Sequence, residues 1–310
     1  MSALHEAVDD YISVRRCLGF KLEDYPWMLH DFVDYLESHG ESKVTTQLAL
    51  EWAQRPGADS HLSYLGKRLS VVRGFARHMR AFDPDSEVPP AYLMGWQACR
   101  AIPYIYSGQD IKAVMSAARS LKPELRAVTY QTLVGLLFVT GARVGEMIRL
   151  DRDDISWEDG VVVIRYSKFG KSRELPLHPS TLDALGHYAE VRDRLCREPK
   201  SSSFFVNTLG RRLAYETVHQ VFNKLTDAAG LRARSDNCRP RIHDTRHSFA
   251  CATLVGWYRT GVDVQAQLPV LSAWLGHAKP ENSYWYLSAV PELLALAAQR
   301  RQQHQGRDRA

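Results

Sequence analysis

Apolar residues recur at intervals of three and four through most of the first hundred positions of this 310-residue chain. Gly, Pro, Asp and Ser separate the apolar segments from one another. Because this spacing places the apolar side chains on one face of a helix, the pattern predicts an all-helical N-terminal region. The predicted helices are Leu4–Leu18, Tyr25–His39, Thr46–Gln54 and His61–Arg80.

The pattern changes after residue 80, where Asp, Pro, Ser and Glu dominate the segment from Asp83 to Pro90. This composition predicts a linker that ends near Ser107, where a serine followed by Asp110 is typical of a helix start. The expected organisation is a helical domain (1–100), a linker (101–109), a second domain (110–298) and a polar tail (299–310).

The second region alternates between the two kinds of periodicity. Three short segments rich in β-branched and aromatic residues, separated by turns, predict a small antiparallel sheet: Asp154–Trp157, Val161–Tyr166 and Arg173–Leu177. Helical patterns flank them at Pro123–Thr140, Ser180–Arg197, Tyr215–Ala229, His243–Arg259, Val264–Gly276 and Pro291–Arg301. The predicted fold class is therefore mainly α with a small antiparallel β-sheet.

Charge is distributed unevenly between the two regions. Residues 1–100 carry 11 Lys and Arg against 14 Asp and Glu, and the remainder carries 29 against 21. A basic excess in the second region favours a polyanionic partner such as nucleic acid. A solvated basic surface with no partner gives the same count.

Cysteine usage and hydropathy exclude several classes of protein. The five cysteines form no C-x-x-C pair, so neither a disulfide framework nor a zinc ribbon is indicated. The longest apolar stretch, around Leu133 to Val139, is too short to cross a bilayer. The expectation is a soluble, cytoplasmic protein, and no metal-ligand motif indicates a bound metal.

Basic residues line one face of the fourth predicted helix. Arg73, Arg77 and Arg80 lie on this face with no acidic residue among them, so they are candidate contacts to DNA phosphates. The alternative is an ordinary amphipathic helix with a solvated basic face.

Arg143 follows a glycine-broken apolar helix in the sequence Thr-Gly-Ala-Arg-Val-Gly-Glu, which begins at Thr140. A guanidinium at a helix start can offer two parallel donors to phosphate oxygens. Glu146, one helical turn later, is placed to orient it. The alternative is a surface salt bridge between residues three apart.

Lys168 lies in the basic turn between the second and third predicted strands. A lysine at a hairpin tip can reach a substrate and donate a proton to a leaving oxygen. Lys171 and Arg173 of the same turn are candidate DNA contacts. A solvated basic turn is the alternative.

His243 and Arg246 are three residues apart in the run Arg-Ile-His-Asp-Thr-Arg-His from Arg241 to His247. On a helix they point the same way and combine an imidazole with a second guanidinium, while His247 joins that face or supports it from behind. The alternative is that His243 and Asp244 are the metal-binding pair of a phosphohydrolase, but no partner histidine and carboxylate occur at a convincing spacing in the sequence.

Tyr286 follows the Leu-Gly-His run that ends at His277 by nine residues. A phenol is a poor nucleophile until its oxyanion is stabilised, and a ring of cationic groups supplies such a field. The alternative is a tyrosine that only packs.

Taken together, these motifs resemble the catalytic signature of the tyrosine recombinases, or phage integrase family, over roughly Asp110 to Leu294. The resemblance implies that the arginines clamp the scissile phosphate and that His277 adds a hydrogen bond. Lys168, rather than Lys171, would be the general acid, His243 a proton-transfer or positioning residue, and Tyr286, rather than Tyr284, the nucleophile. The implied catalytic set is Arg143, Lys168, His243, Arg246, His277 and Tyr286.

The same resemblance makes the helical N-terminal region a core-binding domain and implies a homo-tetramer on paired double-stranded DNA sites, acting without metal or ATP. The interval from His243 to His277 is longer than in compact members and resembles that of mobile-element integrases. Two alternatives stay open: a type IB topoisomerase, and a DNA-binding accessory protein that has lost catalysis. Integration, excision, resolution and transposition are not distinguished.

Overall fold

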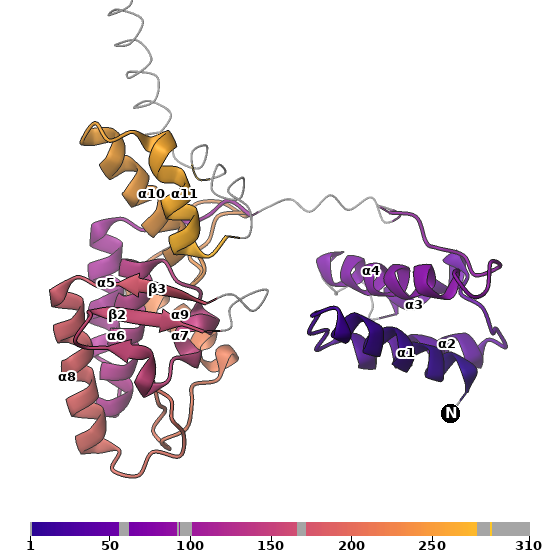
Figure 1. Cartoon of the computed structure of the whole chain (residues 1–310), viewed down its shortest axis with the longest axis horizontal. Coiled ribbons are helices and arrows are strands. Elements are labelled where there is room, and N and C mark those ends of the chain that lie inside the picture. Colours follow the sequence, from indigo (N-terminus) through magenta and orange to yellow (C-terminus); the bar gives the residue numbers. More distant parts are fainter. Residues whose placement is uncertain are drawn as a thin grey trace, which may run out of the picture. The chain divides into compact units, whose positions relative to one another are not determined.

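The computed structural model describes residues 2–55, 62–91, 93, 101–165, 172–277 and 286. The chain divides into two compact units, residues 1–100 and 101–310 (Figure 1). The described elements are mostly helices, with one three-stranded antiparallel sheet in the second unit. This arrangement confirms the predicted fold class.

Four helices lie in the described part of the first unit, and their limits fall within one residue of those predicted. Side-chain caps explain two of the starts: Ser2 accepts from the backbone N–H of His5, and Thr45 accepts from that of Leu48. The apolar faces meet in one core that includes Phe32, Trp52 and Phe75 among its fully buried residues. The helices are α1 (Ala3–Cys17), α2 (Tyr25–Ser38), α3 (Thr46–Gln54) and α4 (Leu62–Met79).

The second unit is built around helix α6 (Glu124–Thr140), which is apolar on nearly every face and is buried accordingly. Helix α5 begins at the predicted position, where Ser107 and Asp110 cap each other's backbone N–H groups. Helix α5 packs on α6 and α9, α8 packs on α6, and the short α7 follows α6 directly. Their bounds are α5 (Gly108–Arg119), α7 (Val144–Arg149), α8 (Pro179–Leu195) and α9 (Tyr215–Ala228).

The sheet has the order β1-β2-β3, with both pairs antiparallel. Its central strand places Val162 opposite Ile155 on one side and Leu175 on the other, and all three are buried. This register turns alternate residues of β2 into the core. A 3₁₀ helix, Arg152–Asp154, leads into the sheet, whose strands are β1 (Ile155–Ser156), β2 (Val161–Ile164) and β3 (Arg173–Pro176).

Helices α10 (Asp244–Arg259) and α11 (Val264–Leu275) form a smaller core of their own, which also includes Tyr286 (orange to yellow in Figure 1). Helix α10 contacts α6, and α11 contacts β3. The predicted helix Pro291–Arg301 lies outside the described residues. Among the helices that are described, none is long and apolar enough to cross a membrane.

Candidate active site

The C-terminal end of α11 is held by side chains from three other segments. The last carbonyls of a helix lack intrahelical partners and carry partial negative charge, which favours cationic donors. Three consecutive carbonyls each accept a hydrogen bond from a different arginine. The pairs are Arg173 Nε with Trp274 O at 2.7 Å, Arg246 Nη2 with Leu275 O at 2.6 Å and Arg143 Nη2 with Gly276 O at 3.1 Å.

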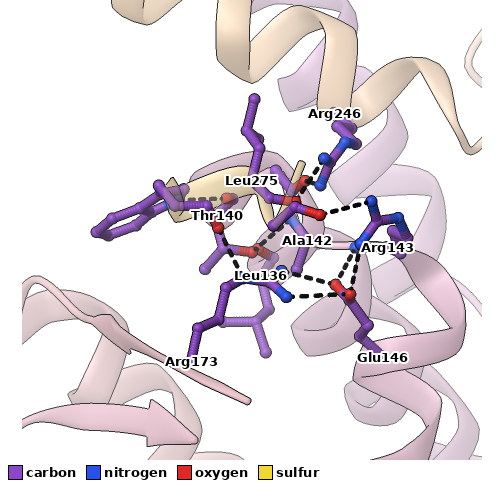
Figure 2. Close-up of polar contacts among 11 residues, drawn as sticks. Leu136, Thr140, Ala142, Arg143, Glu146, Arg173, Arg246 and Leu275 are labelled. Atoms are coloured by element: carbon purple, nitrogen blue, oxygen red, sulfur yellow. Dashed lines mark hydrogen bonds and ion pairs between the residues drawn. The ribbon is translucent and has the colours of Figure 1, made fainter. Parts of the chain in front are cut away.

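Glu146 joins two of these arginines, Arg143 and Arg173, through its carboxylate. Its Oε1 accepts from Arg143 Nη1 at 2.8 Å and from Arg173 Nη1 at 3.1 Å. Its Oε2 accepts from the backbone N–H of Arg143 at 2.9 Å and from Arg173 Nη2 at 2.8 Å. Figure 2 shows the carboxylate between the two guanidinium groups. Because the Glu146 side chain is only 2% exposed, this is a buried network and not a surface salt bridge.

The charge of Glu146 is fixed by this network. Burial acts to raise the pKa of its carboxyl, but hydrogen bonds and charge from Arg173 and then Arg143 outweigh burial and lower the pKa to about 2. Glu146 is therefore ionised at neutral pH and offsets part of the charge of two cations. These two contacts with Arg143 agree with the sequence-based expectation that Glu146 orients that arginine.

Arg246 is the most deeply buried of the three arginines. The residue is 2% exposed, and in addition to Leu275 O it bonds to Gly141 O through Nη1 at 2.9 Å. Burial lowers its pKa to about 10, although nearby Tyr286 and Glu146 act against the decrease. Arg246 thus stays protonated at neutral pH, with its guanidinium plane fixed by two main-chain oxygens.

Two glycines make this carbonyl arrangement possible. Gly141 ends α6 with φ of 61° and Gly276 ends α11 with φ of 65°, both in the left-handed region that glycine adopts without strain. A Cβ on Gly276 would lie 2.7 Å from Arg173 Nη1, and one on Gly141 would lie 2.5 Å from a ring carbon of Phe249. Both positions therefore require close approach as well as positive φ.

Tyr286 lies beside Arg246, with its side chain turned into the protein. The residue is 3% exposed, and it hydrogen-bonds Arg246. Its ring lies parallel to that of His277, with an angle of 14° and centroids 6.0 Å apart.

The two histidines of the predicted set lie in the same positive field. Burial, followed by the charges of Arg246, Arg143 and Arg173, lowers the pKa of His277 to about 4. Burial, followed by the charge of Arg246, also lowers the pKa of His243. Both imidazoles are consequently neutral at pH 7 in the protein without DNA.

The start of α10 fixes the position of His243, which is the residue before the helix. The next residue, Asp244, is fully buried and accepts two hydrogen bonds from Arg241, at 2.9 and 2.8 Å. His247 follows on the same helical face, with ring centroids 5.2 Å from His243 and 5.3 Å from Tyr286. His247 therefore lies between these two side chains, a position that the helical spacing alone did not assign.

Five of the six residues predicted to be catalytic come together in the structure: Arg143, His243, Arg246, His277 and Tyr286. Lys168 and Lys171 lie outside the described residues. Arg173, a predicted DNA contact, donates from its three nitrogens to Glu146 and to Trp274 O in the protein without DNA.

The remaining predicted DNA contacts lie on α4 and just beyond it. Arg73 donates to Pro89 O and Pro90 O, both at 2.7 Å. Arg77 and Arg80 are exposed. Among these three arginines, the latter two present their charge to solvent most openly.

Sequence reasoning missed the structural part played by Trp274. Its indole N–H donates to Thr140 O at 2.8 Å, which joins the ends of α6 and α11. The sequence marks this residue only by its position, two residues before the glycine that ends a helix. That position does not identify the hydrogen-bond acceptor, because Thr140 is 134 residues away in the sequence.

The sequence pattern that describes the phage integrase family matches residues 106–292, which include every residue of this site. The chain belongs to the phage integrase family. It is an enzyme of the tyrosine recombinase type. The chain is 42% identical over 306 residues to y4rB of Sinorhizobium fredii (strain NBRC 101917 / NGR234), a protein named as an integrase/recombinase. The match covers 97% of each chain.

Solved structures of tyrosine recombinases share the fold. XerH site-specific recombinase bound to its difH substrate superimposes with a TM-score of 0.65 at 19% identity, covering 88% of this chain and 78% of XerH. A lambda integrase tetramer bound to a Holliday junction gives a TM-score of 0.60 at 17% identity, covering 91% of this chain and 76% of the integrase. At these identities the likeness concerns the fold alone.

Proposed function

We propose that this tyrosine recombinase cuts and rejoins double-stranded DNA through a 3′-phosphotyrosyl intermediate. The position of Tyr286 beside Arg246 and His277 is the observation that supports this proposal most directly. The phenolic oxygen forms a bond to phosphorus while the bond from phosphorus to the 5′ oxygen breaks. The phenol loses its proton and the departing 5′ oxygen gains one, so a free 5′-hydroxyl results.

Arg143 and Arg246 are the proposed ligands of the nonbridging phosphate oxygens. Each already holds one or two main-chain oxygens, so its guanidinium is oriented before DNA arrives. The Arg143 side chain is 30% exposed, which leaves it accessible to a substrate. Losing one such preorganised donor typically slows a reaction about 100- to 1,000-fold. These charges are the proposed means of stabilising the transition state without a metal or ATP.

The histidines and the hairpin lysine complete the proposed chemistry. Neutral His277 can donate one hydrogen bond to a phosphate oxygen while its other nitrogen accepts. His243 is the proposed proton-transfer or positioning residue, by resemblance to the family. Lys168 is the proposed general acid for the departing 5′-hydroxyl on the same basis.

Exchange of strands requires two DNA duplexes. Attack by the 5′-hydroxyl of the second duplex on the phosphotyrosine reverses the first step and conserves the energy of the phosphodiester bond. We propose four copies of the chain around the paired sites, since lambda integrase forms a tetramer on a Holliday junction. The helical unit is the proposed core-binding domain, with the exposed Arg77 and Arg80 as phosphate contacts.

Trapping of a covalent adduct on nicked suicide DNA tests the proposal. The wild-type chain should form the adduct, and Tyr286→Phe should abolish it while DNA binding persists. Tyr215→Phe, at an exposed tyrosine on α9, is the matched control and should react like the wild type. An undiminished adduct in the Tyr286→Phe chain would refute the assignment of the nucleophile.

The two alternative functions predict different results with the wild-type chain. A type IB topoisomerase would relax a supercoiled plasmid as a monomer, without exchange between sites. An accessory protein without catalysis would bind DNA and form no adduct. Recombination between two target sites on one plasmid, dependent on Tyr286, supports the recombinase over both.

A further inference from the structure

Helices α1 and α2 each carry a histidine and an aspartate four residues apart, on faces that meet. The pairs are His5 with Asp9 on α1 and His30 with Asp34 on α2, and residues at this spacing share one side of a helix. The two imidazole rings stack with centroids 5.0 Å apart and an angle of 18°. Their Nδ1 atoms are 2.7 Å apart.

These four side chains form one continuous series of polar contacts. Asp9 Oδ1 lies 3.2 Å from His30 Nε2, and His5 Nε2 lies 3.0 Å from Asp34 Oδ1. Glu37, one turn after Asp34 on α2, places Oε2 4.0 Å from the same His5 nitrogen. The ligand atoms of His5, Asp34 and Glu37 all lie within 4.8 Å of one another.

The contacts in this series outnumber the hydrogens that two neutral imidazoles carry. Three of its contacts involve ring nitrogens: Asp9 with His30, His30 with His5, and His5 with Asp34. Each needs a hydrogen, but two neutral imidazoles carry only two N–H groups between them. Two neutral imidazoles thus leave one of the three contacts without a hydrogen, and a metal ion held between His5 Nε2 and the two carboxylates of α2 would remove the need for one there.

A metal ion on His5 Nε2 satisfies every contact. His5 then carries its hydrogen on Nδ1 and donates it to His30 Nδ1, and His30 donates from Nε2 to Asp9. A metal-bound histidine characteristically donates its second ring N–H to an outer group of this kind. Zinc accepts both histidine nitrogen and carboxylate oxygen as ligands, and a site with three protein ligands leaves the fourth position to water.

We propose that His5, Asp34 and Glu37 bind one divalent transition metal of the zinc class. His30 and Asp9 form the outer part of the site, which fixes the orientation of the His5 ring. The ion joins α1 to α2, because His5 lies on one helix and both carboxylates on the other. The site lies wholly within the helical unit and is separate from the recombination chemistry.

Titration of the metal-stripped, full-length chain with Zn²⁺ tests the proposal without reference to activity. Calorimetry should show one equivalent bound. Asp34→Asn should weaken binding at least about tenfold, and His30→Ala should weaken it about 10- to 100-fold, as losses of outer partners do. The Asp34 side chain is 70% exposed, so its replacement leaves the core of the unit untouched.

Asp10→Asn is the matched control, since it removes the same charge from an exposed position of α1 next to the site. This variant should bind Zn²⁺ as the wild type does. Mg²⁺ should not compete, because it avoids imidazole ligands. Lack of a one-to-one zinc complex in the wild-type chain, or equal affinities in the wild-type and Asp34→Asn chains, would overturn the proposal.

Discussion

The carboxylate of Glu146 receives both terminal nitrogens of Arg173, at 3.1 and 2.8 Å, in a bidentate pair that is almost fully buried. The same carboxylate holds Arg143, the proposed phosphate ligand, through its side chain and its backbone N–H. Arg173 thus acts on Arg143 through a shared anion. Geometry at the proposed phosphate site depends on a residue that need not touch DNA.

Glu146→Gln should lower the free energy of unfolding, and the loss should depend on pH. The folded pKa of about 2 lies below the usual value of 4.5, so the charge stabilises the fold above pH 4.5 and this stabilisation is lost as pH falls toward 2. The difference between wild type and variant should shrink by about 1.4 kcal/mol from pH 7 to pH 3.5. Urea unfolding at both pH values measures it. A pH-independent difference would contradict the network.

Arg173→Ala should slow adduct formation at saturating DNA by about 100-fold, because small misplacements of a reacting group cost this much. Its DNA affinity should fall no more than that of Arg149→Ala, the control at an exposed arginine on α7. Cleavage rates and salt-dependent binding of the two variants distinguish the possibilities. A large loss of affinity confined to Arg173→Ala would restore the interpretation of Arg173 as a DNA contact.

Gly276→Ala should impair cleavage more than Gly261→Ala. Both glycines have positive φ, so each substitution carries a backbone cost of about 1–2 kcal/mol. A Cβ at Gly261 meets nothing within 4 Å, whereas one at Gly276 displaces Arg173. Both variants should therefore unfold at a lower temperature, and Gly276→Ala at the lower of the two because it also disturbs the buried pair of Arg173 and Glu146. Adduct formation should slow only in Gly276→Ala. Equal rates would remove the role assigned to this close approach.

His277 should remain neutral down to about pH 5 in the DNA-free protein. Its folded pKa of about 4 lies below the usual 6.5, so it contributes stability above pH 6.5 that is lost as pH falls toward 4. A titration of its ring resonance by NMR should show the low midpoint, and a bound phosphate should raise it. His277→Asn should lose less stability than the wild type between pH 6.5 and pH 4.

EDTA should leave the rate of adduct formation unchanged, because arginines supply the charges proposed to act on the phosphate. The measurement is best made in the Asp34→Asn chain, which lacks a ligand of the proposed zinc site. Any effect of the chelator there would concern the chemistry and not the helical unit. Cleavage that stops in EDTA and returns with Mg²⁺ would contradict a metal-free mechanism.

Most of the fold was predictable because it depends on local patterns. The four N-terminal helices follow the apolar spacing, and the start of α5 follows from the Ser107 and Asp110 caps. The sheet followed from its β-branched segments and turns. These signals lie within a few residues of the elements that they define.

The internal supports of the site were less accessible to sequence reasoning. Arg173 resembled its basic neighbours in the turn, and its acceptor Glu146 lies 27 residues earlier in the chain. The contact of Tyr286 with Arg246 likewise depends on how α10 and α11 pack. Side-chain direction in a tertiary contact has no local signature, so family resemblance indicated the residues and only the fold brought them together.

The main-chain oxygens of Leu275 and Gly276 occupy positions on Arg246 and Arg143 that a negatively charged group could otherwise take. The partial negative charges of these two carbonyls thereby offset part of the positive charge of the arginines. They reduce the mutual repulsion of the neighbouring arginines, so the protein keeps these positive charges close together and stays folded before it binds DNA.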